Sequence, residues 1–147
     1  MSTTAKQAFD AVITRLQAIL VSGGYNTDAG GQVYNGVRFF QDDQIFPILT
    51  VFSGDEVVEK LTYNDWRLER TVNIEGYVKD ATTPTTSLEQ LIEDIQRAIE
   101  QSDTTMGGLV EMIDYTGVEE IDPPEAGSDI AGVRVTYLFT YRRTYGA

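Results

Sequence analysis

The chain of 147 residues is 41% hydrophobic and 23% charged, which is ordinary for one globular domain, and we expect a single domain over residues 1–147. Acidic residues outnumber basic ones by 23 to 11, and the net charge of −12 argues against a surface that grips a nucleic-acid backbone. Cysteine and histidine are absent, which excludes disulfides, thiolate catalysis and cysteine-based metal sites and removes the usual general base near neutral pH.

The first predicted element is an amphipathic helix over residues 4–22, because apolar side chains recur there at spacings of three and four. Thr4 and Gln7 fit a capping box at its start. The polar, turn-rich residues 25–35 that follow predict a mobile loop. Asn35-Gly36 then suits a tight turn between short strands.

A nearly continuous apolar run over residues 45–53 predicts a strand that is buried on both faces. Pro47 places its start at a sheet edge or outside the hydrogen-bonded ladder. Residues 54–56 (Gly-Asp-Glu) are expected to end the strand, and residues 57–65 to form a long hairpin arm or loop. Two residues of that polar arm are candidates for apolar contact with another chain. They are Val57 and Val58.

Two long runs, residues 66–79 and 130–145, alternate between the two faces of an extended chain. At roughly 3.3 Å per residue the second run spans on the order of 45 Å, well beyond the usual strand. We expect these two strands to be neighbours, because strands of such length satisfy each other's backbone groups best. Trp66 is interpreted as a core or strand-end residue rather than a ligand contact.

A second helix is predicted after a Thr/Pro linker at residues 81–86, with Thr86/Glu89 or Ser87/Gln90 as its capping box. One face of this helix is apolar and the other is charged. The apolar stripe comprises Leu88, Leu91, Ile92, Ile95, Ala98 and Ile99. The residues expected to face out are Glu89, Glu93, Asp94, Arg97 and Glu100.

Residues 109–121 are expected to contain one or two strands, interrupted at Thr116-Gly117, and residues 123–127 to form the loop that leads to the closing strand. The order of elements predicts an α+β domain. Its sheet is mainly antiparallel, includes two long strands and packs against two α-helices, with each helix covering one sheet face with its stripe.

Signals for catalysis are poor, because the chain lacks a nucleophile elbow, a P-loop, a dinucleotide fingerprint and a zinc-protease motif. Residues 26–31 resemble the start of a calcium loop but have Val37 where the last carboxylate belongs, so a flexible loop is preferred. Asp42-Asp43 and Glu119-Glu120-x-Asp122 are paired carboxylates, but adjacent strand residues point to opposite faces, which favours solvated charge. No catalytic, cofactor-binding or metal-binding residue is predicted, and the protein is not expected to be an enzyme.

The aromatic row of the closing strand has two interpretations. It could stack nucleic-acid bases, or it could be a core face packed under a helix, which the acidic charge favours. The row comprises Tyr137, Phe139, Tyr141 and Tyr145. Arg142-Arg143 is interpreted as an end-of-strand charge pair near acids rather than an anion site. No apolar run approaches the roughly 20 residues needed to cross a membrane, so no membrane partner is expected.

The order of the elements and the residue pattern within them resemble those of the tail terminator (tail completion) proteins of long-tailed bacteriophages over nearly the whole chain. The N-terminal helix is followed by a short strand at residues 35–39 and a proline-led apolar strand ending in Gly-Asp-Glu at residues 47–56. A long alternating strand then ends in residues 75–78 (Glu-Gly-Tyr-Val). A capped helix follows, and residues 135–142 (Val-Thr-Tyr-Leu-Phe-Thr-Tyr-Arg) belong to the closing strand.

This resemblance implies a structural virion protein that forms a hexameric ring at the head-proximal end of the tail tube. The ring stops the addition of tube subunits and provides the surface on which the head docks. The implied partners are other copies of the chain, the tail tube protein, the head-completion or connector protein and, in a contractile tail, the tail sheath. DNA passes through the lumen without specific binding. The implied location is the tail or neck of the virion, and the host cytoplasm during assembly.

Charge and strand edges suggest how copies could join. Residues 85–129 contain twelve acids and one base, Arg97, whereas the closing strand has three arginines and no acid, so the chain carries two patches of opposite sign. Neighbours could also complete each other's exposed strand edges. We hypothesise that acids such as Glu89, Glu93 and Asp94 line the lumen and repel passing DNA.

Two alternatives remain open on the sequence. One is another phage ring protein, either a neck or connector-completion protein or a baseplate component. The other, of a different class, is a small soluble ligand-binding module or an enzyme that uses carboxylates.

Overall fold

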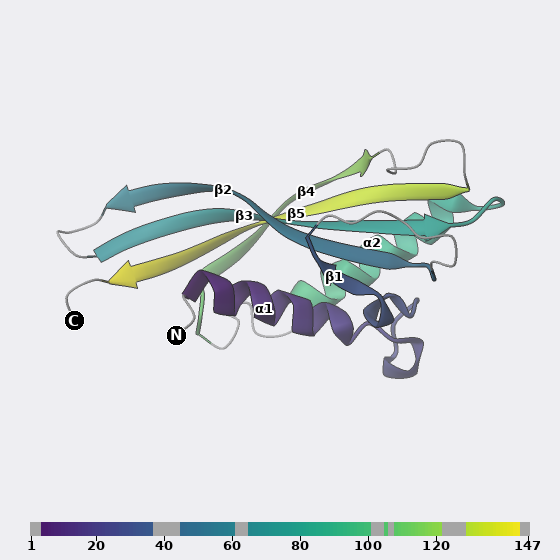
Figure 1. The fold of residues 1–147 in the computed structure, drawn as a ribbon, viewed down its shortest axis with the longest axis horizontal. Coiled ribbons are helices and arrows are strands. Elements are labelled where there is room, and N and C mark those ends of the chain that lie inside the picture. Colours follow the sequence, from purple (N-terminus) through teal and green to yellow (C-terminus); the bar gives the residue numbers. More distant parts are fainter. Residues whose placement is uncertain are drawn as a thin grey trace.

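The computed structural model describes residues 4–36, 45–60, 65–100, 105, 108–121 and 129–144. Within them the chain forms an α+β fold of two α-helices and a five-stranded sheet with the strand order β1-β2-β3-β5-β4, which confirms the predicted class (Figure 1). β1 runs parallel to β2, and all other neighbours are antiparallel. The elements are α1 (Thr4–Gln17), the 3-10 turns η1 (Val21–Gly23) and η2 (Ala29–Gly31), β1 (Val33–Asn35), β2 (Ile48–Lys60), β3 (Asp65–Lys79), α2 (Pro84–Glu100), β4 (Met112–Ile121) and β5 (Ile130–Thr144).

The two long strands are neighbours, as predicted. β3 and β5 pair without interruption from Asp65 opposite Thr144 to Lys79 opposite Ile130. The continuous ladder satisfies the backbone groups on the shared side of both strands, which is the reason for expecting them to pair. The C-terminal ends of β2 and β5 and the N-terminal end of β3 extend past the helices (Figure 1).

Both helices pack on the same face of the sheet, and no helix of the described residues covers the other face (Figure 1). As predicted, each helix packs its apolar stripe on the sheet. Both stripes, however, pack on the same face. Arg15 of α1 donates a hydrogen bond from Nη1 to the carbonyl oxygen of Ile99 at 3.0 Å, which joins the two helices. The largest buried side chains that helices and sheet share are Leu16, Leu91, Ile95, Ile74 and Tyr137.

α1 ends at Gln17, five residues before the predicted end at Ser22. The chain tightens after it, because Ala18 and Ile19 donate to carbonyl oxygens three residues earlier, at 3.2 and 3.0 Å. Gly30 then packs against the C-terminal end of α1, and its N–H donates a hydrogen bond to the carbonyl oxygen of Ile19 at 2.8 Å. A Cβ at position 30 would lie 2.4 Å from the carbonyl oxygen of Gln17, so only glycine fits this close contact.

β2 continues past the point where the sequence predicts its end. Residues 54–56 (Gly-Asp-Glu) form a β-bulge, because the register with β3 shifts between Ser53 and Glu56. Pairing then resumes and reaches Lys60, so this part of the polar arm is one side of a hairpin. Residues 48–51 are buried on both faces, as predicted.

α2 begins at Pro84, so both predicted capping boxes are wrong, because Thr86 and Ser87 lie inside the helix. Proline suits the first helical position, where no N–H is needed. Asp80 organises this start instead: Oδ1 accepts from the N–H groups of residues 82 and 83, both at 2.9 Å, and Oδ2 accepts from the hydroxyl of Ser87 at 2.6 Å. The Ser87 bond, followed by the backbone bonds, holds the pKa of Asp80 below its usual range.

Residues 112–121 form one strand, with a β-bulge between Tyr115 and Gly117, where the sequence predicts an interruption. Gly117 has a φ of 148°, which suits glycine. Gly36 also has a positive φ, 93°, but the strand expected after it and the predicted loop at residues 123–127 lie outside the described residues.

Candidate functional site

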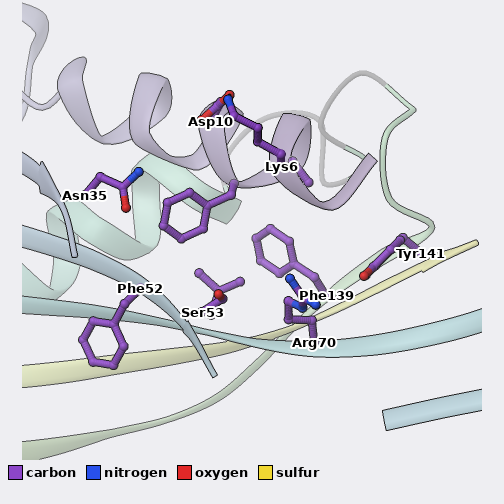
Figure 2. Close-up of a pocket in the computed structure, with 11 residues that line it drawn as sticks. Lys6, Asp10, Asn35, Phe52, Ser53, Arg70, Phe139 and Tyr141 are labelled. Carbon is purple, nitrogen blue, oxygen red and sulfur yellow. The ribbon is translucent and has the colours of Figure 1, made fainter. Parts of the chain in front are cut away.

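A cleft of about 410 Å³ lies between the first half of α1 and the sheet (Figure 2). On the helix, Lys6 Nζ lies 2.7 Å from Oδ2 of Asp10. On the sheet, Nη2 of Arg70 lies 3.0 Å from Oε1 of Glu56, which also accepts a hydrogen bond from the hydroxyl of Tyr141. The apolar part of the wall comes from Ala8, Phe9, Val72 and Phe139, whereas the ring of Phe52 points to the opposite face, where Arg134 lies over it. The cleft is thus amphipathic, with each of its two cations already paired to a carboxylate.

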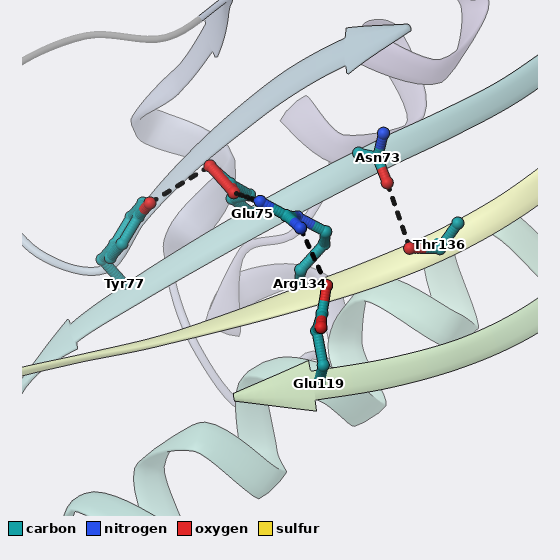
Figure 3. Close-up of polar contacts among 6 residues, drawn as sticks. All are labelled: Asn73, Glu75, Tyr77, Glu119, Arg134 and Thr136. Atoms are coloured by element: carbon teal, nitrogen blue, oxygen red, sulfur yellow. Dashed lines mark hydrogen bonds and ion pairs between the residues drawn. The ribbon is translucent and has the colours of Figure 1, made fainter. Parts of the chain in front are cut away.

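The helix-free face carries an ion-pair network across three strands (Figure 3). Nε and Nη2 of Arg134 lie 3.2 and 2.9 Å from Oε2 of Glu75, and Nη1 lies 2.8 Å from Oε1 of Glu119. The hydroxyl of Tyr77 donates to Oε1 of Glu75 at 3.2 Å. Hydrogen bonding to Glu75, the largest cause, raises the pKa of Arg134. With its donors and acceptors occupied by each other, the network ties β3, β5 and β4 together.

The buried Tyr77 is expected to lower the free energy of unfolding at high pH. Burial, reinforced by the charge of Glu75, raises the pKa of Tyr77 to about 12, whereas an unfolded tyrosine titrates near 10. Between these values the unfolded chain loses a proton that the folded one keeps, so the free energy of unfolding should fall by about 1–2 kcal/mol between pH 10 and 12. Urea unfolding of the protein and of Tyr77→Phe at pH 9 and 11 checks this. The loss should be smaller in the variant, and equal losses would contradict the assignment.

Two of the three closing-strand arginines, Arg134 and Arg142, are already paired with acids. Arg134 pairs with Glu119, as described above. Arg142 pairs with Glu111 at 2.6 Å between Nε and Oε1. Both acids belong to the acidic segment 85–129, so the segments of opposite sign meet within one copy. The expectation that they would offer two separate patches for contact between copies is wrong for these two arginines.

Asp94 does not face out, because its side chain is completely buried. Its Oδ1 accepts from the N–H of Asn26 at 2.9 Å, and its Oδ2 accepts from the N–H and the hydroxyl of Thr27 at 2.8 and 2.7 Å. Arg97 of the same helix donates to the carbonyl oxygen of Gly24 at 3.1 Å and lies over the ring of Tyr25. The segment predicted to be a mobile loop is therefore held against α2. Asp94 is also excluded from lining a lumen.

The sequence could have revealed this role of Asp94. Leu91, Asp94, Ile95 and Ala98 follow the spacing of one helix face, so Asp94 lies on the apolar stripe. A carboxylate in such a position requires hydrogen-bond donors. The polar segment with several small residues that could supply them precedes it by about 65 residues, so only the fold brings them together.

The remaining candidates have simple roles where the structure describes them. Tyr137, Phe139 and Tyr141 are 0%, 3% and 4% exposed, which confirms the core interpretation of the aromatic row. Trp66 is half-buried against the same core. Glu119 and Glu120 point to opposite faces of β4, as predicted. The candidates outside the described part of the chain are Asp42, Asp43, Asp122, Tyr145 and the side chain of Arg143.

Exposed apolar side chains gather on two sheet edges. Val57 and Val58 of β2 are 63% and 47% exposed. Met112, Tyr115 and Val118 of β4 are 49%, 45% and 37% exposed. These are five of the eight large apolar side chains that are exposed among the described residues, and the sequence singled out only the two valines. The exposed apolar residues of β4 could not be recognised from the sequence, because the bulge at residue 116 interrupts the alternation of faces along the strand.

Within the described ranges, no three or more acidic side chains are arranged as a metal ion would require. In the same part of the chain, no helix is long and apolar enough to cross a membrane. The sequence matches no protein-family model and no curated protein.

Proposed function

We propose that the protein is a structural subunit of a bacteriophage tail that forms a hexameric ring at the head-proximal end of the tail tube. The ring ends tube polymerisation and provides the surface on which the head docks. The observation that carries the proposal is the gathering of exposed apolar side chains on two edges of one sheet, which fits a subunit whose surface is completed by neighbours. The α+β layout with long strands fits the tail terminator proteins that the sequence resembles.

The proposed partners are other copies of the chain, the tail tube protein, the head-completion or connector protein and, in a contractile tail, the sheath. DNA would pass through the lumen without specific binding. Glu89 and Glu93 are exposed on α2 and are the acids that we propose for the lumen wall. Reversal of both charges should slow DNA passage and reduce infectivity, and unchanged infectivity would remove these residues from the wall.

Light scattering and negative-stain images of the purified protein, alone and mixed with tail tubes, test the ring. We expect closed rings of six copies, either in solution or only at one end of each tube. The mixed sample should also stop further tube growth. A protein that stays monomeric in solution and in the presence of tubes would contradict the proposal. A ring found at the portal or at the tail tip would favour a neck, connector-completion or baseplate protein.

The cleft under α1 supports a second candidate of another class, a ligand-binding module. Its volume of about 410 Å³ lies within the range of small-molecule sites, and it combines aromatic walls with Lys6, Asp10 and Arg70. Native mass spectrometry of the purified protein tests this candidate. A retained small molecule that is lost in Phe139→Ala would support it, and an unliganded mass in both proteins would count against it.

A further inference from the structure

The outer edge of β2 is only partly covered. β1 pairs with residues 49–51 alone, and β2 continues to Lys60. Among the described residues, no strand pairs with this edge of β2 beyond Val51. An edge of this kind can pair with another strand. Val57 and Val58 lie beyond the bulge, on opposite faces, and both are exposed. This part of β2 thus presents two exposed valines among charged residues, on an edge that no described strand covers.

The outer edge of β4 is paired with no other strand among the described residues. β4 pairs with β5 on one side, and no described strand lies on the other. Its register with β5 places Met112 on the helix-free face and Tyr115 and Val118 on the face that the helices cover. Proteins usually protect such edges with lysine, proline or a covering loop. In the described part of β4 the edge carries a bulge and three acids but neither lysine nor proline, and three apolar side chains remain exposed.

We infer that the outer edge of β2 in one copy pairs with the outer edge of β4 in the next. This inference rests on the proposed function and names the contact that would build its ring. The partner strand belongs to a second copy, because each copy provides one β2 edge and one β4 edge. When two copies join, the assembly still presents one β2 edge and one β4 edge to further copies. Contact between two different patches is the heterologous arrangement that closes into a ring.

The sheet order also fixes the direction of the contact. β2 runs parallel to β5 and β4 runs antiparallel to β5, so β2 and β4 run in opposite directions within one copy. Copies that continue one sheet around a ring share a strand direction. β4 therefore pairs with the neighbour's β2 in antiparallel fashion, and the helices of all copies lie on the same side of the joined sheet.

Charge opposes this contact in dilute salt. Asp55 and Glu59 flank the two valines of β2, and Asp114 and Glu120 lie on β4. Like charges brought together across strands are unfavourable, and salt screens them. Association should therefore rise with ionic strength, from about 0.05 M to about 0.5 M. The inference thus predicts that copies with a net charge of −12 associate more weakly in dilute salt.

The absence of cysteine from the chain allows a clean cross-linking test. Val57 lies on the helix-free face, because it pairs with Glu69. Copies with Val57→Cys are mixed with copies that carry a single cysteine on β4 and are oxidised mildly at about 0.5 M salt, where screening is strong. The β4 positions on the same face are Met112, Asp114, Glu119 and Ile121, and the controls on the other face are Tyr115, Val118 and Glu120.

We expect a disulfide-linked dimer on a non-reducing gel for at least one same-face mixture and for none of the controls, because directly opposite residues lie within disulfide reach. Each variant alone should stay unlinked, and circular dichroism checks that all are folded. A dimer from Val57→Cys alone would show β2 pairing with β2, and cross-links only to added tube protein would show another occupant. Either result overturns the inference.

The two proposals can fail separately. Six-membered rings in negative stain with no same-face cross-link would overturn the edge contact and leave the ring function standing. Same-face cross-links in open chains that never close would support the edge contact and overturn the ring. If neither rings nor cross-links form, with or without tail tubes, both proposals are wrong.

Discussion

Replacing Asp94 with alanine is expected to lower the free energy of unfolding by about 2–4 kcal/mol, because hydrogen bonds to a charged group contribute about 1.5–3 kcal/mol each and water can reach part of the freed donors. The change removes three hydrogen bonds and leaves the N–H groups of Asn26 and Thr27 without their acceptor. Such a loss is a large fraction of the roughly 5–15 kcal/mol that stabilises a typical domain. Urea unfolding followed by circular dichroism measures it. Hydrogen exchange should also become faster at residues 24–28, where the chain is held against α2.

Glu93→Ala is the matched control, because Glu93 is the preceding residue of the same helix and its side chain is exposed. It should change the stability by less than about 0.5 kcal/mol. Asp94→Asn should fall between the two, because its amide group would present donors to the N–H and hydroxyl of Thr27, which are themselves donors. Equal stability of Asp94→Ala and Glu93→Ala would show that the buried carboxylate does not hold residues 24–28 against α2.

Gly30→Ala is the second change with a large expected effect, about 2–4 kcal/mol of destabilisation, because overpacking against backbone cannot be relieved by a rotamer change. The new methyl group would lie 2.4 Å from the carbonyl oxygen of Gln17 and 2.7 Å from that of Ile19. The chain at residue 30 would have to move away from the end of α1. The bond from the N–H of Gly30 to Ile19 would be lost with this movement.

The adjacent glycine provides the control for this change. A Cβ at Gly31 would meet no atom within 4 Å, and Gly31 does not have a positive φ. Gly31→Ala should therefore be neutral or stabilise the protein by up to about 1 kcal/mol, by restricting the unfolded chain. Thermal unfolding of the two variants separates the steric effect at residue 30 from the general cost of replacing a glycine. If both variants unfold at the same temperature, the close contact between residue 30 and the end of α1 does not require glycine.

These sites lie away from the proposed contact surfaces. Asp94, Gly30 and the Arg15 bond to Ile99 hold α1, the segment after it and α2 to one face of the sheet. The Glu75–Arg134–Glu119 network fixes the other face. The two outer edges are the part of the fold that these contacts leave incomplete. A rigid body with two unfinished edges is what an assembly subunit requires, because a ring closes only when every copy presents its edges at the same angle.

The sequence predicted the elements well where the pattern was long and regular. The alternating runs that became β3 and β5 and the apolar stripe of α2 each span ten or more residues, so local irregularities did not hide the period. Boundaries were less predictable. α1 ends early because Gly30 packs against its C-terminal end, and β2 continues through Gly54-Asp55-Glu56 because a bulge absorbs them. Both outcomes depend on segments that are not adjacent in the sequence or on pairing with another strand.

By itself, the sequence determined the α+β class, the pairing of the two long strands and the burial of the aromatic row, because each follows from which side of an element is apolar. Only the tertiary structure decided that both helices share one face, that Asp94 points inward, that Arg134 and Arg142 are paired within the chain and that no described strand covers the two outer edges. A periodic pattern shows which side of an element is to be buried. It does not show which distant residues meet that side, and charge pairing and edge exposure depend on those neighbours.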